Sequence, residues 1–179
     1  MPILPDTPKA LQLTTNVMPI LAAANVAPST HPLLALTRLH QSLLLASFPP
    51  SITQDALDTL VRASSASVRG LSAVLVPGHP IRALALAELG KLLAVDEPAP
   101  TAAKGTFPPS GAPRLQLAYE TLVNARSELV VAFGKRGGEV GAEVREMIVR
   151  IEAELGTWRQ GIKNAIEDTP GIRKGSRHR

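Results

Sequence analysis

Apolar residues recur along this chain at intervals of three and four positions, the spacing of one face of an α-helix. The pattern is cleanest between positions 140 and 166. Proline and glycine interrupt it and divide the chain into segments. No segment alternates as a half-buried strand does, so we predict an all-α fold. The six expected helices cover Thr7–Val26, Pro32–Ser47, Thr53–Val76, Pro80–Val95, Pro113–Phe133 and Glu139–Ile166.

Single residues refine these boundaries. Pro19 is expected to kink or split the first helix. Thr53 has the side chain of an N-cap, and Gly134 is placed to end the fifth helix. The helix over Pro80–Val95 is apolar nearly all round, which predicts a place in the middle of a packed layer. Residues 98–113, rich in proline, alanine, glycine and threonine, are expected to form a flexible loop.

Two of the expected helices resemble each other. His31–Ala46 aligns without gaps on His79–Ala94, and seven of the sixteen positions are identical, including the initial His-Pro. Recurring helical units stack into superhelices of antiparallel helix pairs. We therefore predict a tetratricopeptide-like superhelix of about six helices. The alternative is that two helices rich in leucine and alanine match by composition.

The positive charge is concentrated at the C-terminus. The chain of 179 residues has a formal net charge of +4, and four basic residues, Arg173, Lys174, Arg177 and Arg179, lie in its last nine positions. Because the remaining Lys and Arg balance the acids, the high isoelectric point of 9.9 reflects a tail. We expect one domain over residues 1–166 and a disordered basic tail over 167–179. A nucleic-acid-binding domain would instead carry a basic face.

The residue inventory excludes several chemistries. Without cysteine there can be no thiolate zinc site, Fe–S cluster or cysteine nucleophile. No apolar run reaches the roughly 18 residues of a membrane span, and no signal peptide is recognisable, so we expect a cytoplasmic or nuclear protein. His31 and His79 each precede a proline and are expected to fill turns. Gly134–Gly138 lacks the spacing of a phosphate-binding loop. We predict no catalytic residue, no cofactor and no metal.

Binding of a protein or peptide partner remains as the expected activity. Basic or amide side chains on the inner surface of a helical repeat can hold a partner's carboxylates. The candidates are Arg82, Lys91, Asn124 and Arg126. The alternative is that these side chains are simply solvated or paired in salt bridges.

The stretch from Pro77 to Leu93 (PGHPIRALALAELGKLL) is the most distinctive in the chain. It resembles a helix in the C-terminal domain of SET-and-MYND-type protein lysine methyltransferases, especially fungal ones. Arg114–Tyr119 is similar to that family's next helix, and Ile148–Trp158 to its last. Pro32–Val76 is similar in layout to the preceding helices. The resemblance covers about residues 10–165, although the segment 98–113 is longer than expected.

The resemblance implies a tetratricopeptide-like domain that packs on a catalytic core, walls its substrate cleft and docks partners, in some members a chaperone C-terminus. The family's SET motifs, which bind S-adenosylmethionine and supply the catalytic tyrosine, have no counterpart here. Its cysteine-based zinc sites cannot exist in this chain. No catalytic residue therefore carries over from the family.

Three hypotheses follow from the sequence. The first is a non-catalytic helical scaffold that binds a protein or peptide. The second is a fragment of an S-adenosylmethionine-dependent protein lysine methyltransferase that works with a separate SET core. The third is a helical repeat that binds nucleic acid through its basic tail, which the neutral remainder of the chain argues against.

Overall fold

The structure, a computed structural model, describes residues 6–27, 31–46, 53–99 and 107–167, and for residues 31–35 and 162–167 the backbone only. These residues form six α-helices and no strand, which confirms the all-α prediction. The helices are α1 (Thr7–Ala23), α2 (His31–Ala46), α3 (Gln54–Val74), α4 (Pro80–Leu93), α5 (Ala112–Phe133) and α6 (Gly138–Glu167).

The observed boundaries lie within three residues of those predicted. The Thr53 side chain accepts a hydrogen bond from the Ala56 amide at 3.3 Å, as an N-cap does. Gly134 follows the end of α5 with a φ of 85°, a value that glycine adopts without steric cost. The expected split at Pro19 is wrong, because α1 runs through it. Pro19 lies on the exposed side of α1, where water can satisfy the carbonyl that loses its partner.

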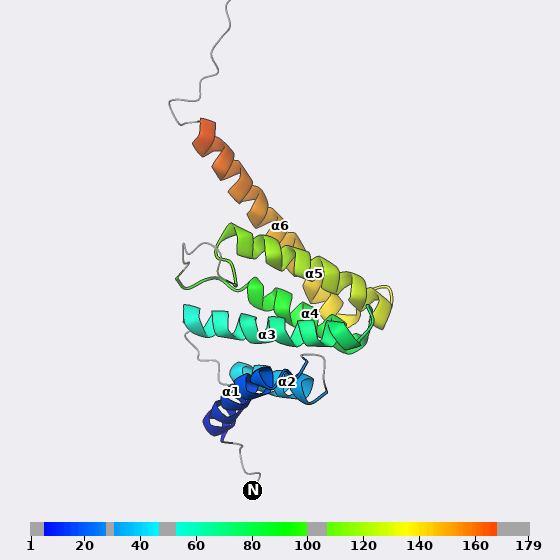
Figure 1. The fold of residues 1–179 in the computed structure, drawn as a ribbon. Helices are drawn as coiled ribbons and strands as arrows, with labels where there is room; N and C mark the ends of the chain where they lie inside the picture. Colours follow the sequence, from blue (N-terminus) through cyan, green and yellow to red (C-terminus); the bar gives the residue numbers. More distant parts are fainter. Residues whose placement is uncertain (1–5, 28–30, 47–52, 100–106, 168–179) are drawn as a thin grey trace, which may run out of the picture.

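Each helix packs against its neighbours in the sequence, so the chain forms a stack from α1 and α2 at one end to α5 and α6 at the other (Figure 1). The most extensive packing is between α4 and α5. The helix α4 also packs against α3 and α6. This confirms the prediction that α4, which is apolar on nearly all sides, lies in the middle of the packed helices.

The hydrophobic core is built by α3, α4, α5 and α6. Small side chains allow α4 to approach α5 closely, because a Cβ on Gly90 would lie 2.6 Å from the Leu122 side chain. Larger apolar side chains fill the space around this contact. The fully buried members of the core are Leu57, Val61, Ala83, Ala118, Leu122, Ala125, Leu129 and Val144.

The pair formed by α1 and α2 extends the stack beyond α3 and is held partly by polar groups. Thr14 is buried, and its hydroxyl lies 2.9 Å from Nδ1 of His40. Burial lowers the pKa of His40 below its ordinary value. Exposed apolar side chains remain on this pair, including Leu13 and Ile20. The contact between α1 and α2 therefore includes a partly buried pair of polar side chains, while some apolar side chains of α1 stay exposed.

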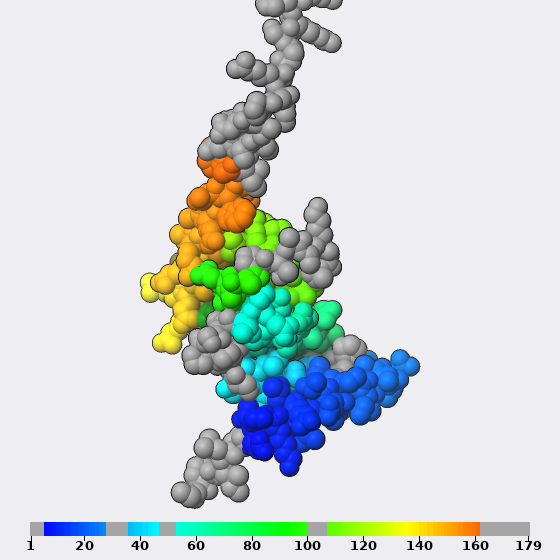
Figure 2. All heavy atoms as spheres, turned by 90° about the vertical axis from the view of Figure 1, so that its left-hand side faces the viewer, coloured from blue at the N-terminus to red at the C-terminus, as the bar shows by residue number. Residues whose placement is uncertain are grey.

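At the other end, α6 projects beyond the stack, as Figures 1 and 2 show. Tyr119 in α5 donates a hydrogen bond of 2.8 Å to Glu152 in α6, and this bond raises the pKa of the tyrosine. Positions 100–106 of the expected loop and 168–179 of the expected tail lie outside the described residues. In the described part, no helix combines the length and hydropathy required to span a bilayer.

The connection between α4 and α5 is tied to α3 by a buried cluster of polar groups. Arg114 is 1% exposed, and its guanidinium lies 2.9 Å from the Asp58 carboxylate and donates to the Leu93 carbonyl at 3.2 Å. Glu97 accepts a hydrogen bond of 2.6 Å from the Gly111 amide. These contacts fix where the chain leaves α4 and where it enters α5.

Candidate functional site

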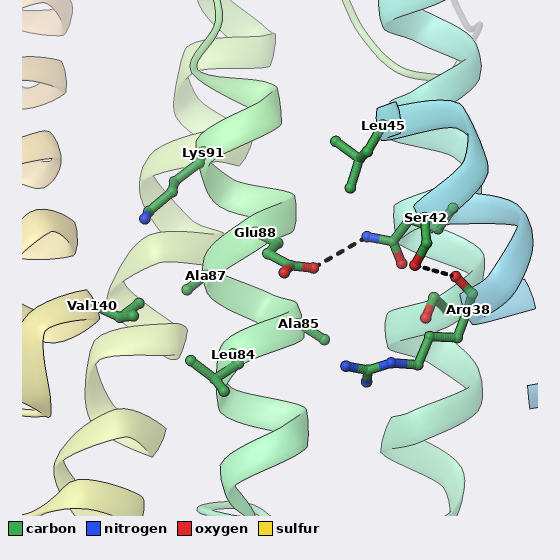
Figure 3. Close-up of a pocket in the computed structure, with 11 residues that line it drawn as sticks. Arg38, Ser42, Leu45, Leu84, Ala85, Ala87, Glu88, Lys91 and Val140 are labelled. Atoms are coloured by element: carbon green, nitrogen blue, oxygen red, sulfur yellow. Dashed lines mark hydrogen bonds between the residues drawn. The ribbon is translucent and has the colours of Figure 1, made fainter. Parts of the chain in front are cut away.

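A groove lies between α2 and α4. Both helices pack against α3, but over the described residues their backbones do not contact each other. The gap holds a cavity of about 230 Å³. Its walls come from α2 and α4, with contributions from α3 and α6 (Figure 3). The lining side chains are those of Arg38, Gln41, Ser42, Leu45, Ser67, Leu84, Ala85, Ala87, Glu88, Lys91 and Val140.

One hydrogen bond crosses the groove. Gln41 in α2 donates through Nε2 to Oε2 of Glu88 in α4, at 3.2 Å (Figure 3). Gln41 is 5% exposed, so its amide needs this partner, whereas Glu88 is exposed. The bond links α2 to α4, which are otherwise held in place by their packing on α3.

Arg38 extends its guanidinium into the groove (Figure 3). Among the described residues no carboxylate pairs with this cation. Arg38, Gln41, Ser42 and Leu45 follow one another at helical intervals, so α2 presents them on one face. Arg38 was not predicted from the sequence as a binding residue, because the pattern of this helix was read from its leucines and not from the polar residues between them.

Lys91 is the one predicted partner-binding residue that lines the groove. It forms an ion pair with Glu143 of α6. The same lysine borders a second, more open cavity of about 410 Å³ between α4 and α6, which Glu146, Met147 and Arg150 also line. Charged groups therefore continue from the α2–α4 groove across the face of α4 to α6.

Arg82 lies in a different place and has partners inside the fold. Its guanidinium is 3.0 Å from the Glu128 carboxylate and donates to the Leu75 carbonyl at 3.0 Å. Glu128 also accepts from the Gly78 amide at 3.2 Å. These bonds hold the turn between α3 and α4 against α5. Arg82 therefore matches the alternative stated from the sequence, a side chain paired in a salt bridge.

Asn124 and Arg126 are exposed on α5 and do not line the groove. The four predicted residues thus do not share one surface. Asn124 and Arg126 are two positions apart on α5, so their side chains point to different sides of the helix. The sequence pattern did not show which of these sides faces a groove.

The histidines do not gather. Nδ1 of His79 accepts from the Ile81 amide at 3.3 Å and caps α4, as expected of a residue that fills a turn. His40 pairs with Thr14, and the side chain of His31 lies outside the described residues. Across the described ranges, no three His, Asp or Glu side chains are placed to hold a metal ion.

The chain was compared with known protein families and with curated proteins. Neither comparison found a match.

Proposed function

We propose that this chain is a non-catalytic helical interaction domain that binds a carboxylate-bearing peptide in the groove between α2 and α4. The observation that carries the proposal is the Arg38 guanidinium, which extends into the groove and has no paired carboxylate among the described residues. A guanidinium binds carboxylates through paired hydrogen bonds, and such charge-assisted bonds are stronger than neutral ones.

The remaining groups of the groove support this assignment. Leu45 and Leu84 offer apolar contact, while Gln41 and Ser42 offer hydrogen bonds. Lys91 supplies a second cation if a ligand carboxylate displaces Glu143, which is 59% exposed in its ion pair and so weakly held. The groove therefore combines apolar side chains with polar and charged ones, so it can contact both the carboxylate and the apolar parts of a peptide.

The experiment is site-specific photocrosslinking. A photoreactive amino acid replaces Ser42 in the groove, and in a second protein it replaces Arg126, which is exposed on α5 away from the groove. Cell extract is added, and crosslinked peptides are identified by mass spectrometry. We expect acidic peptides from position 42 alone, and we expect Arg38→Glu to remove them.

Two outcomes would contradict the proposal. One is an identical set of crosslinks from positions 42 and 126, which would indicate non-specific contact. The other is a set from position 42 that Arg38→Glu leaves unchanged. Calorimetric binding of S-adenosylmethionine by the isolated chain would contradict the non-catalytic assignment.

A finer form of the proposal is that the domain is related to the C-terminal domain of SET-and-MYND methyltransferases. It rests on the phrase Pro77–Leu93 in the sequence, in which Gly78 and Arg82 secure the turn before α4. The partner would then be a SET catalytic core or a chaperone C-terminus, and the location cytoplasmic or nuclear. Co-purification with a separately expressed SET-and-MYND catalytic region tests this form, and failure of the two to associate would remove it.

A further inference from the structure

A second cavity, of about 240 Å³, lies where α4 ends, α5 begins and α6 passes over both. It is smaller than the roughly 300–1,000 Å³ of a typical small-molecule site, and so suits a single side chain. Apolar walls come from Leu93, Val95, Leu115 and Trp158. The polar lining consists of Asp96, Glu97, Gly111, Arg114 and Glu154.

The charge of this cavity is negative. Asp96, Glu97 and Glu154 contribute three carboxylates, and Arg114 is the single cation in the lining. Asp58, which is not in the lining, already pairs with Arg114 at 2.9 Å. The carboxylates of the lining therefore exceed the positive charge available to them.

Glu97 has a buried oxygen in this cavity that lacks a hydrogen-bond donor. Its side chain is 9% exposed, and Oε2 accepts from the Gly111 amide. Its other oxygen, Oε1, is buried, has no hydrogen-bond partner and is 3.9 Å from Nη1 of Arg114. A buried carboxylate oxygen without a donor is unfavourable, and a hydrogen-bond donor entering the cavity would remove that cost.

Trp158 supplies the complementary surface. It lies on α6 and is 47% exposed. An indole face attracts a guanidinium or ammonium, and nearby carboxylates add to the attraction. An exposed tryptophan beside Glu154 and Glu97 is therefore suited to a lysine or arginine side chain.

We propose that this cavity binds a basic side chain of the chain's own C-terminal segment, residues 173–179. That segment carries Arg173, Lys174, Arg177 and Arg179 and no acid, so its charge is opposite to that of the cavity. It follows α6 and is therefore tethered to the helix that supplies Trp158 and Glu154.

The length of the chain permits the contact. Glu154 lies about 20 Å from the end of α6 at Glu167, at 1.5 Å per helical residue. Residues 168–173 can span about 20 Å when extended, so Arg173 and the basic residues after it can return to the cavity. Pro170-Gly171 is a dipeptide typical of turns. A short tether gives an effective concentration near the millimolar range, so weak binding suffices.

Trp158 is the only tryptophan in the sequence and reports directly on the site. The experiment compares acrylamide quenching of its fluorescence in the full chain and in a chain that ends at Gly171. We expect the quenching constant to rise about twofold on truncation, because the indole loses its cover. We also expect high salt to raise the quenching of the full chain to that of the truncated one.

A peptide of residues 168–179, added to the truncated chain, should restore protection of Trp158. Glu154→Gln should weaken that restoration severalfold. Glu146→Gln is the matched control, since Glu146 is also exposed on α6 but lines the cavity between α4 and α6. Circular dichroism establishes that each variant keeps its helix content.

Equal quenching of the full and truncated chains at low salt would overturn the proposal. If the added peptide then still protected Trp158, the cavity would belong to a basic segment of a partner. If it gave no protection, the cavity would not be a cation site. This cavity and the α2–α4 groove have no lining residue in common, so neither result depends on the proposed function.

Discussion

The guanidinium of Arg114 in α5 lies 2.9 Å from the carboxylate of Asp58 in α3, although α3 and α5 are not in direct backbone contact. The arginine reaches Asp58 past the end of α4 and donates to the Leu93 carbonyl on the way. Gln54 supports the carboxylate with a hydrogen bond of 2.9 Å. One buried side chain therefore connects three consecutive helices.

Replacing Arg114 should destabilise the fold strongly. Arg114→Met keeps most of the buried volume but leaves the Asp58 and Glu97 carboxylates without their cation. We expect a loss of about 3 kcal/mol in the free energy of unfolding, measured by urea denaturation. The control is Arg62→Met, because Arg62 is exposed on α3 and bonds only Thr59 among the described residues. A cost for Arg114→Met no larger than that of the control would show that the cluster does not stabilise the fold.

Gly90 should not tolerate alanine. A Cβ at this position would lie 2.6 Å from the Leu122 side chain and 3.3 Å from its backbone nitrogen. We expect Gly90→Ala to destabilise the protein by about 1–3 kcal/mol, even though alanine favours helix. Gly156→Ala is the control, since nothing lies within 4 Å of its Cβ, and it should stabilise α6 by up to about 1 kcal/mol. The thermal unfolding temperature of both variants is the measurement. A fall for Gly90→Ala and a rise for Gly156→Ala would show that packing outweighs helix propensity at position 90.

Substitutions of Arg82 and Arg126 should differ in their effect on the free energy of unfolding, and neither should change partner binding in the α2–α4 groove. Arg82→Gln removes the ion pair with buried Glu128 and should cost about 2 kcal/mol. Arg126→Gln changes an exposed side chain and should stay within about 0.5 kcal/mol. Chemical denaturation of the two variants measures the difference. Equal costs would mean that the turn between α3 and α4 does not depend on Arg82.

The packing of α1 on α2 should weaken in acid. Burial lowers the pKa of His40 in the folded state, so the unfolded state binds a proton more readily. The contribution of neutral His40 to stability is therefore complete above the unfolded pKa of about 6.5 and is lost as the pH falls towards the folded value. We expect the protection factors of the α1 amides, which are corrected for the intrinsic pH dependence of exchange, to fall between pH 7.5 and pH 5.5.

His40→Gln is the control for this pH dependence. Glutamine can still bond the Thr14 hydroxyl but does not titrate, so α1 of the variant should exchange at rates that follow only the intrinsic chemistry. The other histidines remain in both proteins. An equal fall in the protection factors of the variant would assign the effect to other groups.

The helices could be predicted because their determinants are local. The stripe of apolar residues in α6, the Thr53 cap and the glycine after α5 each act within a few positions of the chain. The candidate site could not be predicted in the same way. Lys91, a predicted partner-binding residue, lines the groove, but Arg38, whose guanidinium extends into it, was overlooked.

Residue spacing and composition were sufficient to predict an all-α chain of six helices, the central place of α4 and the absence of cysteine chemistry. Periodicity and composition are sufficient for these, since each follows from spacing or from residue type. Which charged side chains pair inside the fold became clear only from the packing of the helices. Arg82 and Arg114 meet Glu128 and Asp58 across helices distant in sequence, while Arg38 remains unpaired among the described residues. Such pairing depends on how the helices stack, and no local pattern specifies it.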